Sequence, residues 1–234
     1  STTLYATVNA VSRPEINVIT VEDPVEYRLA GINQVQVNPK AGLTFAAALR
    51  SILRSDPDVV LIGEIRDHET AQIAIEASLT GHLVLSTLHT NDAPSSITRL
   101  IEMGIEPFLV GSALDSVVAQ RLARKLCDRC KQPYEAGERE LALAGVHHEG
   151  ADRPVLHRAG GCTSCSQTGY RGRLALHEVM AVTEDIERMA VAGASSLEIG
   201  SAARQQGMLT LRDDGWQKVL QGRTSLEELL RVVA

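Results

Sequence analysis

Residues 58–64 read Asp58-Val59-Val60-Leu61-Ile62-Gly63-Glu64, an unbroken apolar run that ends in a glycine and a carboxylate. Such a run without polar alternation is typical of a strand buried on both faces of a parallel sheet. Similar runs lie at residues 16–21 and 83–87, and the segments between the runs carry apolar residues at helical spacing. This alternation predicts an α/β fold with helices on both faces of a parallel sheet.

Several helices are expected around these strands. Thr44 can cap a helix whose apolar positions are 45, 49, 52 and 53, and a second helix follows Asp67. A third closes at Gly104, and helical spacing from residue 114 to about 126 predicts a fourth. Residues 174–182 are expected to form a strand that returns to the first domain. Beyond them, Ser195…Glu198 and Ser225…Glu228 fit the capping boxes that begin helices.

Composition excludes several classes of protein. The 234 residues are 44% hydrophobic and 22% charged, which is ordinary for one large or two smaller globular domains and unlike a disordered, collagenous or coiled-coil chain. A net charge of -6 and only 3% aromatic residues disfavour a nucleic-acid partner. The longest apolar runs are far below the roughly 20 residues of a membrane span, and no signal peptide opens the chain. We expect a cytoplasmic protein without direct membrane insertion.

All four cysteines lie in two C-x-x-C pairs, Cys127/Cys130 and Cys162/Cys165. Each pair presents two thiolates from one tight turn, and two such turns complete the tetrahedral shell that Zn²⁺ prefers. Two disulfides are the alternative, which a reducing cytoplasm opposes. The predicted zinc site is structural, because no nearby group offers an open catalytic position. Residues 127–170 are rich in glycine and poor in periodicity, so we expect them to bury little apolar surface.

Polar side chains stand at the ends of the three predicted strands. Glu64 ends the run at 58–64, Glu22 follows the strand at 16–21, and His82 and His89 flank the strand at 83–87. Ligands of open α/β sheets bind beyond the carboxyl ends of the strands. Two acids at that edge suit a metal ligand and a water-positioning base, which phosphoryl transfer needs. A solvated strand end, a charged turn and hydrogen-bonded core histidines are the alternatives at this point.

These segments resemble the motifs of the secretion ATPase superfamily, in order and spacing, from Ser1 to about Arg124. Ser1-Thr2-Thr3-Leu4-Tyr5 resembles the end of a Walker A loop. The run around Glu22 resembles the aspartate box, residues 53–67 the Walker B stretch, and residues 81–91 the histidine box. The four cysteines narrow the resemblance to the assembly ATPases of type II secretion and type IV pilus biogenesis, because retraction motors and conjugation-type relatives generally lack them.

The resemblance implies a RecA-like P-loop NTPase core at residues 1–126, a tetracysteine zinc module at 127–170, and a returning strand with a small helical C-terminal subdomain at 171–234. It implies ATP, Mg²⁺ and Zn²⁺ as cofactors and hydrolysis of ATP by a homo-hexamer. The implied partners are an inner-membrane platform protein and other components of the pilus or secretion machine, met at the cytoplasmic face of the inner membrane. The Walker A glycines and lysine would precede Ser1, so we expect an upstream segment.

The resemblance also implies roles for individual residues. Ser1 and Glu64 would hold Mg²⁺, Thr2 would join Ser1 at the nucleotide, Glu22 would orient the attacking water, and His82 and His89 would monitor the γ-phosphate. Glu22 and Glu64 could exchange roles, because Gly63 stands where many P-loop enzymes have an aspartate. The rival interpretation is a non-catalytic, zinc-stabilised scaffold that has lost its nucleotide site. Without the upstream lysine and glycines, this chain alone is expected to hydrolyse ATP negligibly.

Overall fold

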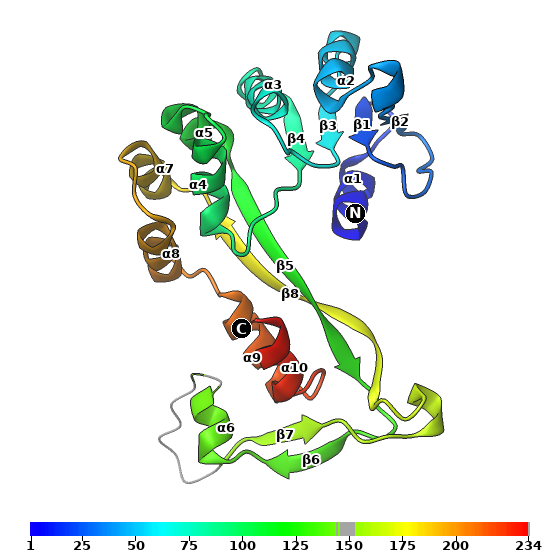
Figure 1. The fold of residues 1–234 in the computed structure, drawn as a ribbon, viewed down its shortest axis with the longest axis vertical. Coiled ribbons are helices and arrows are strands. Elements are labelled where there is room, and N and C mark those ends of the chain that lie inside the picture. The colour runs from blue at the N-terminus through cyan, green and yellow to red at the C-terminus, as the bar shows by residue number, and fades with distance from the viewer. Residues whose placement is uncertain (144, 146–152, 234) are drawn as a thin grey trace. The chain divides into compact units, whose positions relative to one another are not determined.

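The chain divides into two compact units in the computed structural model, which describes residues 1–143, 145 and 153–233 (Figure 1). Unit 1 comprises Ser1–Asp115 and Val182–Ile199, and unit 2 comprises Ser116–Ala181 and Gly200–Ala234. Each unit has its own apolar core. The three-part division expected from the sequence, with boundaries at 126 and 170, stays a prediction.

A four-stranded parallel sheet forms the centre of unit 1. Its strands stand in the order β2 (Asn33–Gln36), β1 (Val18–Glu22), β3 (Val59–Ile62) and β4 (Leu83–Ser86). The apolar runs seen in the sequence therefore form three of the four strands, and β1 and β3 are buried along their whole length. Because the strands are parallel and in register, their carboxyl ends meet at one edge of the sheet.

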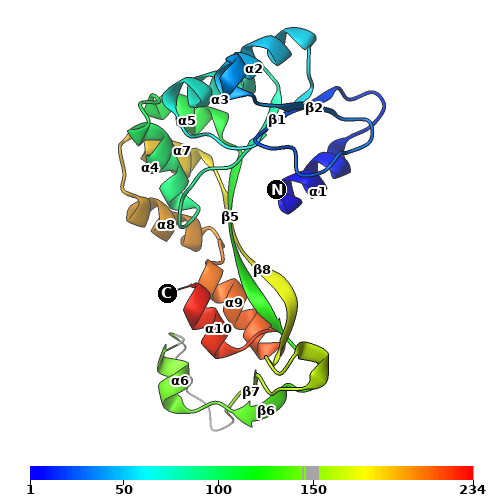
Figure 2. The same ribbon diagram turned by 45° about the vertical axis from the view of Figure 1, so that its right-hand side comes forward.

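Helices cover both faces of this sheet. Helix α1 packs Val8 against Val18, Val59 and Leu61, and it lies on the opposite side of the sheet from α2 and α3 (Figure 2). The predicted N-cap of α2 forms, because Thr44 Oγ1 accepts the Ala47 amide at 3.2 Å. Helix α3 follows Asp67 as expected, and Asp67 is its N-cap, accepting the Thr70 amide at 2.8 Å. The helices of unit 1 are α1 (Thr2–Val11), α2 (Phe45–Ile52), α3 (His68–Leu79), α4 (Pro94–Glu102), α5 (Pro107–Ala113) and α7 (Glu184–Val191), with the 3-10 turns η1 (Pro39–Ala41) and η2 (Leu53–Ser55).

Unit 2 is built on a long antiparallel ribbon of β5 (Ser116–Leu126) and β8 (Tyr170–Ala181). The helix expected from residue 114 to about 126 is therefore wrong. Apolar residues in that segment do recur at helical spacing, but backbone pairing with β8, which lies about 50 residues later in the sequence, decides the conformation. The strand expected at 174–182 is present as β8, after which residues 182–199 belong to unit 1.

The remaining elements of unit 2 share one core. The antiparallel strands β6 (Gln132–Glu135) and β7 (Val155–Arg158), the helix α6 (Glu138–Leu143) and the link between β6 and α6 contribute the buried residues Leu156, Leu141 and Ala136. These pack with β8 and with α9 (Leu211–Leu220) and α10 (Leu226–Val232). Few apolar side chains of the segment 127–170 are buried among its described residues, as expected, and the C-terminal helices supply the partners of those few. None of the described helices is long and apolar enough to cross a membrane.

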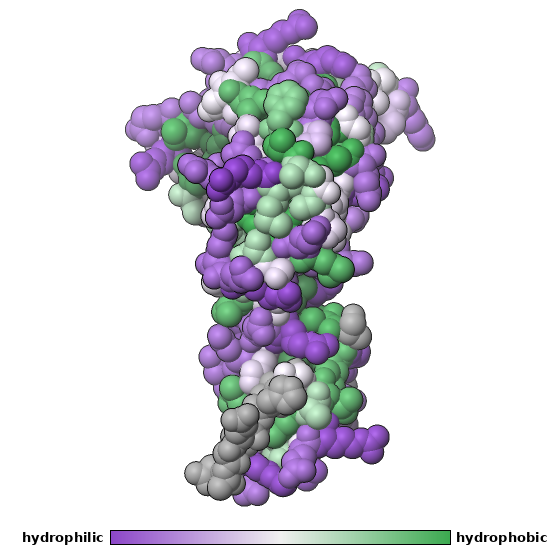
Figure 3. All heavy atoms as spheres, turned by 90° about the vertical axis from the view of Figure 1, so that its left-hand side faces the viewer, coloured by the Kyte–Doolittle hydropathy of each residue, from purple (hydrophilic) through white to green (hydrophobic). Residues whose placement is uncertain are grey.

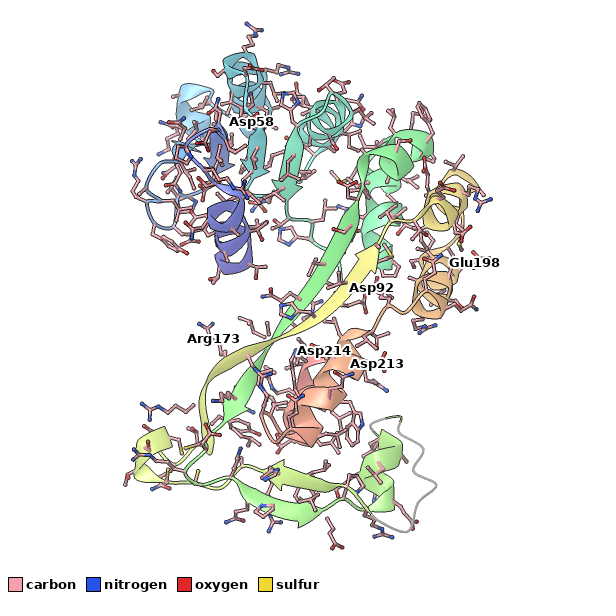
Figure 4. All side chains as sticks on the ribbon, turned by 180° about the vertical axis from the view of Figure 1, so that it is seen from behind. Asp58, Asp92, Arg173, Glu198, Asp213 and Asp214 are labelled. Carbon is pink, nitrogen blue, oxygen red and sulfur yellow. The ribbon has the colours of Figure 1, made fainter. Side chains whose placement is uncertain are left out.

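Side-chain hydrogen bonds attach the C-terminal helices. Asp213 and Asp214 lie in the first turn of α9 (Figure 4). Asp213 completes a capping box with Thr210, and Asp214 accepts the His177 amide of β8 at 2.8 Å. The capping box of Ser195 and Glu198 forms at the start of α8 (Ser196–Gln205).

Glu228 departs from its predicted role. Ser225 accepts the Glu228 amide at 3.2 Å, as a cap should, but the Glu228 carboxylate turns to two arginines. It accepts hydrogen bonds from Arg124 of β5 at 2.7 Å and from Arg231 at 2.6 Å, and its side chain is fully buried. The Arg124 guanidinium also lies 4.1 Å from the centre of the Tyr170 ring. This buried carboxylate therefore ties α10 to the ribbon.

We expect Glu228→Gln to destabilise unit 2 by about 3 kcal/mol at neutral pH, because it leaves Arg124 without its buried partner. Burial raises the pKa of Glu228, but hydrogen bonds from Arg231 and Arg124 outweigh it and lower the pKa to about 2. The stabilisation is thus complete above the unfolded-state pKa and is lost as the pH falls toward 2. Urea unfolding between pH 7 and pH 3 measures this loss. The exposed neighbour Glu227 is the control, and an equal effect of Glu227→Gln would contradict the argument.

Candidate functional site

A pocket of about 170 Å³ lies at the carboxyl ends of β1 and β3. Its lining includes Ser1, Glu22, Gly63, Glu64 and Thr87, which come from α1 and from the ends of three strands. The structure thus brings together the two carboxylates that the sequence places after separate strands. A concave site with convergent polar groups at this edge is the usual place for a ligand in an open α/β sheet.

Glu22 is 4% exposed although it lines the pocket. Its carboxylate accepts hydrogen bonds from the Tyr5 hydroxyl, from Thr20 Oγ1 at 2.5 Å and from Gln34 Nε2 at 3.1 Å. Three donors on three elements compensate the cost of burying this charge. Burial, followed by the hydrogen bond to Glu22, raises the pKa of Tyr5, so the phenol keeps the proton that it donates.

Glu64 is more open than Glu22 and has cationic and imidazole partners. Arg66 Nε lies 2.6 Å and His89 Nε2 lies 3.1 Å from Glu64 Oε2. Burial raises the pKa of Glu64, but the hydrogen bonds from Arg66 and then His89 outweigh it, so the pKa is lowered overall. The carboxylate is therefore ionised at neutral pH, with one oxygen engaged by side chains that are themselves 66% and 80% exposed.

Gly63 has a packing reason to be a glycine. A Cβ at this position would lie 3.3 Å from the Val21 carbonyl oxygen and 3.4 Å from the Glu22 Cα. The Gly63 amide donates to that same carbonyl oxygen at 2.8 Å, and its own carbonyl accepts from Thr87 Oγ1 at 2.7 Å. The backbone of β1 thus crowds the place where an aspartate side chain would begin.

Of the other site residues predicted from the sequence, some lie at the pocket and others do not. Ser1 occupies the N-cap position of α1, without a side-chain capping bond, and lines the pocket, whereas Thr2 is exposed and is not among the lining residues. His82 precedes β4, at the opposite end of the strand from the pocket, and its Nδ1 lies 2.9 Å from the Ala77 carbonyl oxygen. The structure therefore brings His89, but not His82, to the acidic residues. Tyr5, Thr20 and Gln34 are site residues that the sequence reasoning missed, since only tertiary packing joins them to Glu22.

The four cysteine thiols converge within unit 2, and all their sulfur atoms lie within 4.8 Å of one another. Cys127 and Cys162 are 3.9 Å apart, Cys130 and Cys165 are 3.8 Å apart, and Cys162 and Cys165 are 3.7 Å apart, measured between Sγ atoms. A tetrahedron with Zn–S bonds of about 2.3 Å has sulfur–sulfur edges of about 3.8 Å. Disulfide bonds would need about 2.05 Å. The arrangement fits a tetrahedral zinc site and not two disulfides.

Two glycines allow the cysteine turns to approach each other. A Cβ at Gly160 would lie 2.1 Å from the Cys130 carbonyl oxygen, and a Cβ at Gly169 would lie 2.7 Å from the Gly160 carbonyl oxygen. Gly169 also has φ +74° and donates its amide to Cys165 Sγ at 3.2 Å. Burial raises the pKa of the Cys165 thiol, but hydrogen bonds around it outweigh this and bring the pKa to about 6. Glycines beside the cysteine pairs were the available sequence signal for this close packing.

Comparison with known sequences places this geometry in a family. The family described as "Type II/IV secretion system protein" matches residues 1–231. Type II secretion system protein E of Pseudomonas aeruginosa is 54% identical over 232 residues, which cover 99% of this chain and 46% of that protein. The type IV pilus assembly ATPase PilB of Thermus thermophilus is 52% identical over 230 residues, which cover 98% of this chain and 26% of that protein. The chain thus spans less than half the length of either relative.

Comparison with solved structures gives the same fold. The pilus retraction motor PilT with bound ADP matches 98% of this chain and 55% of its own, with a TM-score of 0.69 and 24% identity. The Legionella pneumophila ATPase DotB matches 98% of this chain and 55% of its own, with a TM-score of 0.66 and 22% identity. The predicted RecA-like α/β class, with its clustered tetracysteine group, is confirmed. By its sequence match over nearly the whole length, the chain belongs to the type II/IV secretion system protein family.

Proposed function

We propose that the protein is the ATP-hydrolysing motor subunit that powers assembly of a type IV pilus or a type II secretion pseudopilus. The observation that carries the proposal is the pocket in which Glu22 and Glu64 meet at the carboxyl edge of the sheet. The names of the two relatives that are more than half identical to this chain support the process that the motor serves.

In the proposed reaction a water oxygen attacks the γ-phosphorus of ATP. The new phosphorus–oxygen bond forms as the bond to the β–γ bridging oxygen breaks, and ADP leaves with that electron pair. Glu22 orients the water by accepting its hydrogen bond, and the proton of the water passes to the phosphate product or to solvent. Glu22 is buried and already accepts hydrogen bonds from three side chains, which favours this role over that of a metal ligand.

Ser1 and Glu64 are the proposed Mg²⁺ ligands, directly or through water, because hydroxyl and carboxylate oxygens suit this ion and both line the pocket. When bound, Mg²⁺ neutralises charge on the phosphate oxygens. Thr2, beside Ser1, is proposed to contact the nucleotide. His89 is proposed to contact the γ-phosphate, since it is hydrogen-bonded to Glu64 and exposed. The contact with the γ-phosphate is not proposed for His82, because its ring lies beside the Ala77 carbonyl oxygen and away from the pocket.

We propose that Cys127, Cys130, Cys162 and Cys165 hold one structural Zn²⁺, and the sulfur–sulfur distances support this. The rival function, a zinc-stabilised scaffold without a nucleotide site, gains no support, because the acidic residues are assembled around a pocket.

The proposed function is tested by phosphate release from ATP. We expect the full-length protein to hydrolyse ATP and the 234-residue chain alone to do so negligibly, because the chain itself contains no G-x-x-x-x-G-K motif to hold the β- and γ-phosphates. The background rate of phosphate release is measured with the Glu64→Gln variant of the full-length protein and of the 234-residue chain. Release by the short chain well above that background would contradict the expectation, and a full-length protein without ATPase activity would refute the proposed function.

We also propose that the protein works as a homo-hexamer, with an inner-membrane platform protein and other machine components at the cytoplasmic face of the inner membrane. Exposed apolar residues support an assembly interface: Leu197 is 84% exposed, and Phe108 and Val191 are more than half exposed. The face of unit 1 that carries α5 and α7 shows apolar patches among polar side chains (Figure 3). Light scattering at high concentration should detect an assembly that Leu197→Glu weakens, with Leu79→Glu as the control. A strict monomer would contradict an interface in this chain.

A further inference from the structure

The Glu22 carboxylate accepts hydrogen bonds from three side chains. Thr20 of β1 and Gln34 of β2 both donate to Oε1, at 2.5 and 3.1 Å, and the Tyr5 hydroxyl of α1 donates to Oε2. The donors come from three elements, so no single rotation of Glu22 can keep all of them. The carboxylate plane is therefore fixed in the sheet edge.

A carboxylate offers about four acceptor positions, two on each oxygen. Thr20 and Gln34 fill both positions on Oε1, and Tyr5 fills one on Oε2. Among the described residues no other donor to this carboxylate is present, so one position on Oε2 is left. Because Glu22 lines the pocket, a water bound at that position would be held in one orientation.

The Tyr5 hydroxyl is itself fixed in direction. It accepts the Glu26 amide at 3.2 Å, which leaves its single proton for Glu22. Its ring is 2% exposed and meets the Tyr27 ring edge-on, with 4.6 Å between the ring centres. Gln34 is also fixed, because its Oε1 accepts the Leu29 amide at 2.7 Å. The donors are thus preorganised before any ligand arrives.

We infer that Tyr5 is a positioning residue for hydrolysis: together with Thr20 and Gln34, it leaves Glu22 one acceptor position, on Oε2, with which to orient the attacking water. The inference rests on the proposed function and deepens it. Its physical basis is that a nucleophile held in the attack geometry reacts far faster than one that samples many orientations. The competing explanation is that the donors only satisfy a buried charge and contribute nothing to the rate.

Tyr5→Phe in the full-length protein separates these explanations, because it keeps the ring and removes the hydroxyl. We expect kcat for ATP hydrolysis to fall about 10- to 100-fold with KM nearly unchanged, since the phenol hydroxyl is engaged by the Glu22 carboxylate and the Glu26 amide. Tyr27→Phe is the matched control, because that ring touches Tyr5 but is half exposed and donates nothing to Glu22. Binding of a non-hydrolysable ATP analogue and the thermal unfolding midpoint verify that Tyr5→Phe is folded.

A double-mutant cycle tests whether Tyr5 acts through Glu22. In the Glu22→Gln background we expect Tyr5→Phe to change the residual rate by less than about twofold, because the group that it positions is gone. Full additivity of the two losses would overturn the inference. Should Tyr5→Phe fail to fold, Thr20→Val and Thr20→Ser give the same test, since valine removes the donor and serine keeps it. Equal rates for those two variants would also overturn it.

The outcomes separate this inference from the function on which it rests. An inactive wild-type protein, or a fully active Glu22→Gln variant, would refute the proposed role of Glu22 itself. Loss of activity in Glu22→Gln together with a wild-type kcat in Tyr5→Phe would overturn only the positioning role of Tyr5. A loss of kcat in Tyr5→Phe, absent in Tyr27→Phe and absent in the Glu22→Gln background, would support it.

Discussion

Replacing Glu22 by glutamine in the full-length protein is expected to abolish ATP turnover, a loss of at least about 100-fold, while ATP binding persists. The amide keeps the size of the side chain but removes the negative oxygen that orients the water. Glu22 is not proposed to contact the phosphates, so the affinity for ATP should change little. Steady-state phosphate release and equilibrium binding of a fluorescent ATP analogue measure the two properties separately.

Two further carboxylates serve as comparisons. Glu64→Gln should weaken the dependence on Mg²⁺, because that carboxylate is the proposed metal ligand. Glu26→Gln, at an exposed carboxylate in the same pocket, should leave turnover close to the wild-type value. Identical magnesium titration curves for Glu22→Gln and Glu64→Gln would contradict the assignment of water orientation to Glu22 and of Mg²⁺ binding to Glu64.

Replacing Cys162 by serine is expected to weaken zinc binding and release the cysteine turns. Zn²⁺ binding by small thiolate modules is worth on the order of 10–16 kcal/mol, and the serine leaves three thiolates around an undercoordinated ion. The turns should unfold because the close approach of their backbones at Gly160 and Gly169 then loses the cross-link that four thiolates on one ion supply. Elemental analysis and limited proteolysis are the measurements. The wild type should contain one zinc per chain, and the variant should show new cleavage within 127–170.

The structure narrows the region that this cleavage should affect. Leu156 and Leu141 are buried against the C-terminal helices, so β6, β7 and α6 should resist proteolysis longer than the cysteine turns. The sheet of unit 1, which has a separate aliphatic core, should stay folded. Ser164→Ala, at a half-buried position between two of the cysteines where the hydroxyl accepts a hydrogen bond from Arg171, controls for substitution in the turn. The assignment of the four cysteines to zinc would be overturned by a wild-type protein that contains no metal and yet resists protease.

The sequence by itself determined the parallel sheet, the caps of two of its helices and the two pairs of cysteines. Val59–Ile62 forms β3 as predicted, because a continuous apolar run is stable only where both faces of a strand are covered. Thr44 and Asp67 cap their helices through hydrogen bonds within three residues, which local sequence can specify. The cysteine spacing likewise places each pair of thiolates on one turn, whatever the rest of the chain does.

Only the tertiary structure decided the features that depend on partners distant in the sequence. Residues 116–126 are a strand because β8 pairs with them, and the segment 127–170 has a core because the C-terminal helices cover it. His82 lies away from the pocket because it precedes its strand instead of following it. The donors around Glu22 come from α1, β1 and β2, and no spacing along the chain reveals that they meet. Local propensity acts over a few residues, whereas burial and long-range hydrogen bonds select among the conformations that it allows.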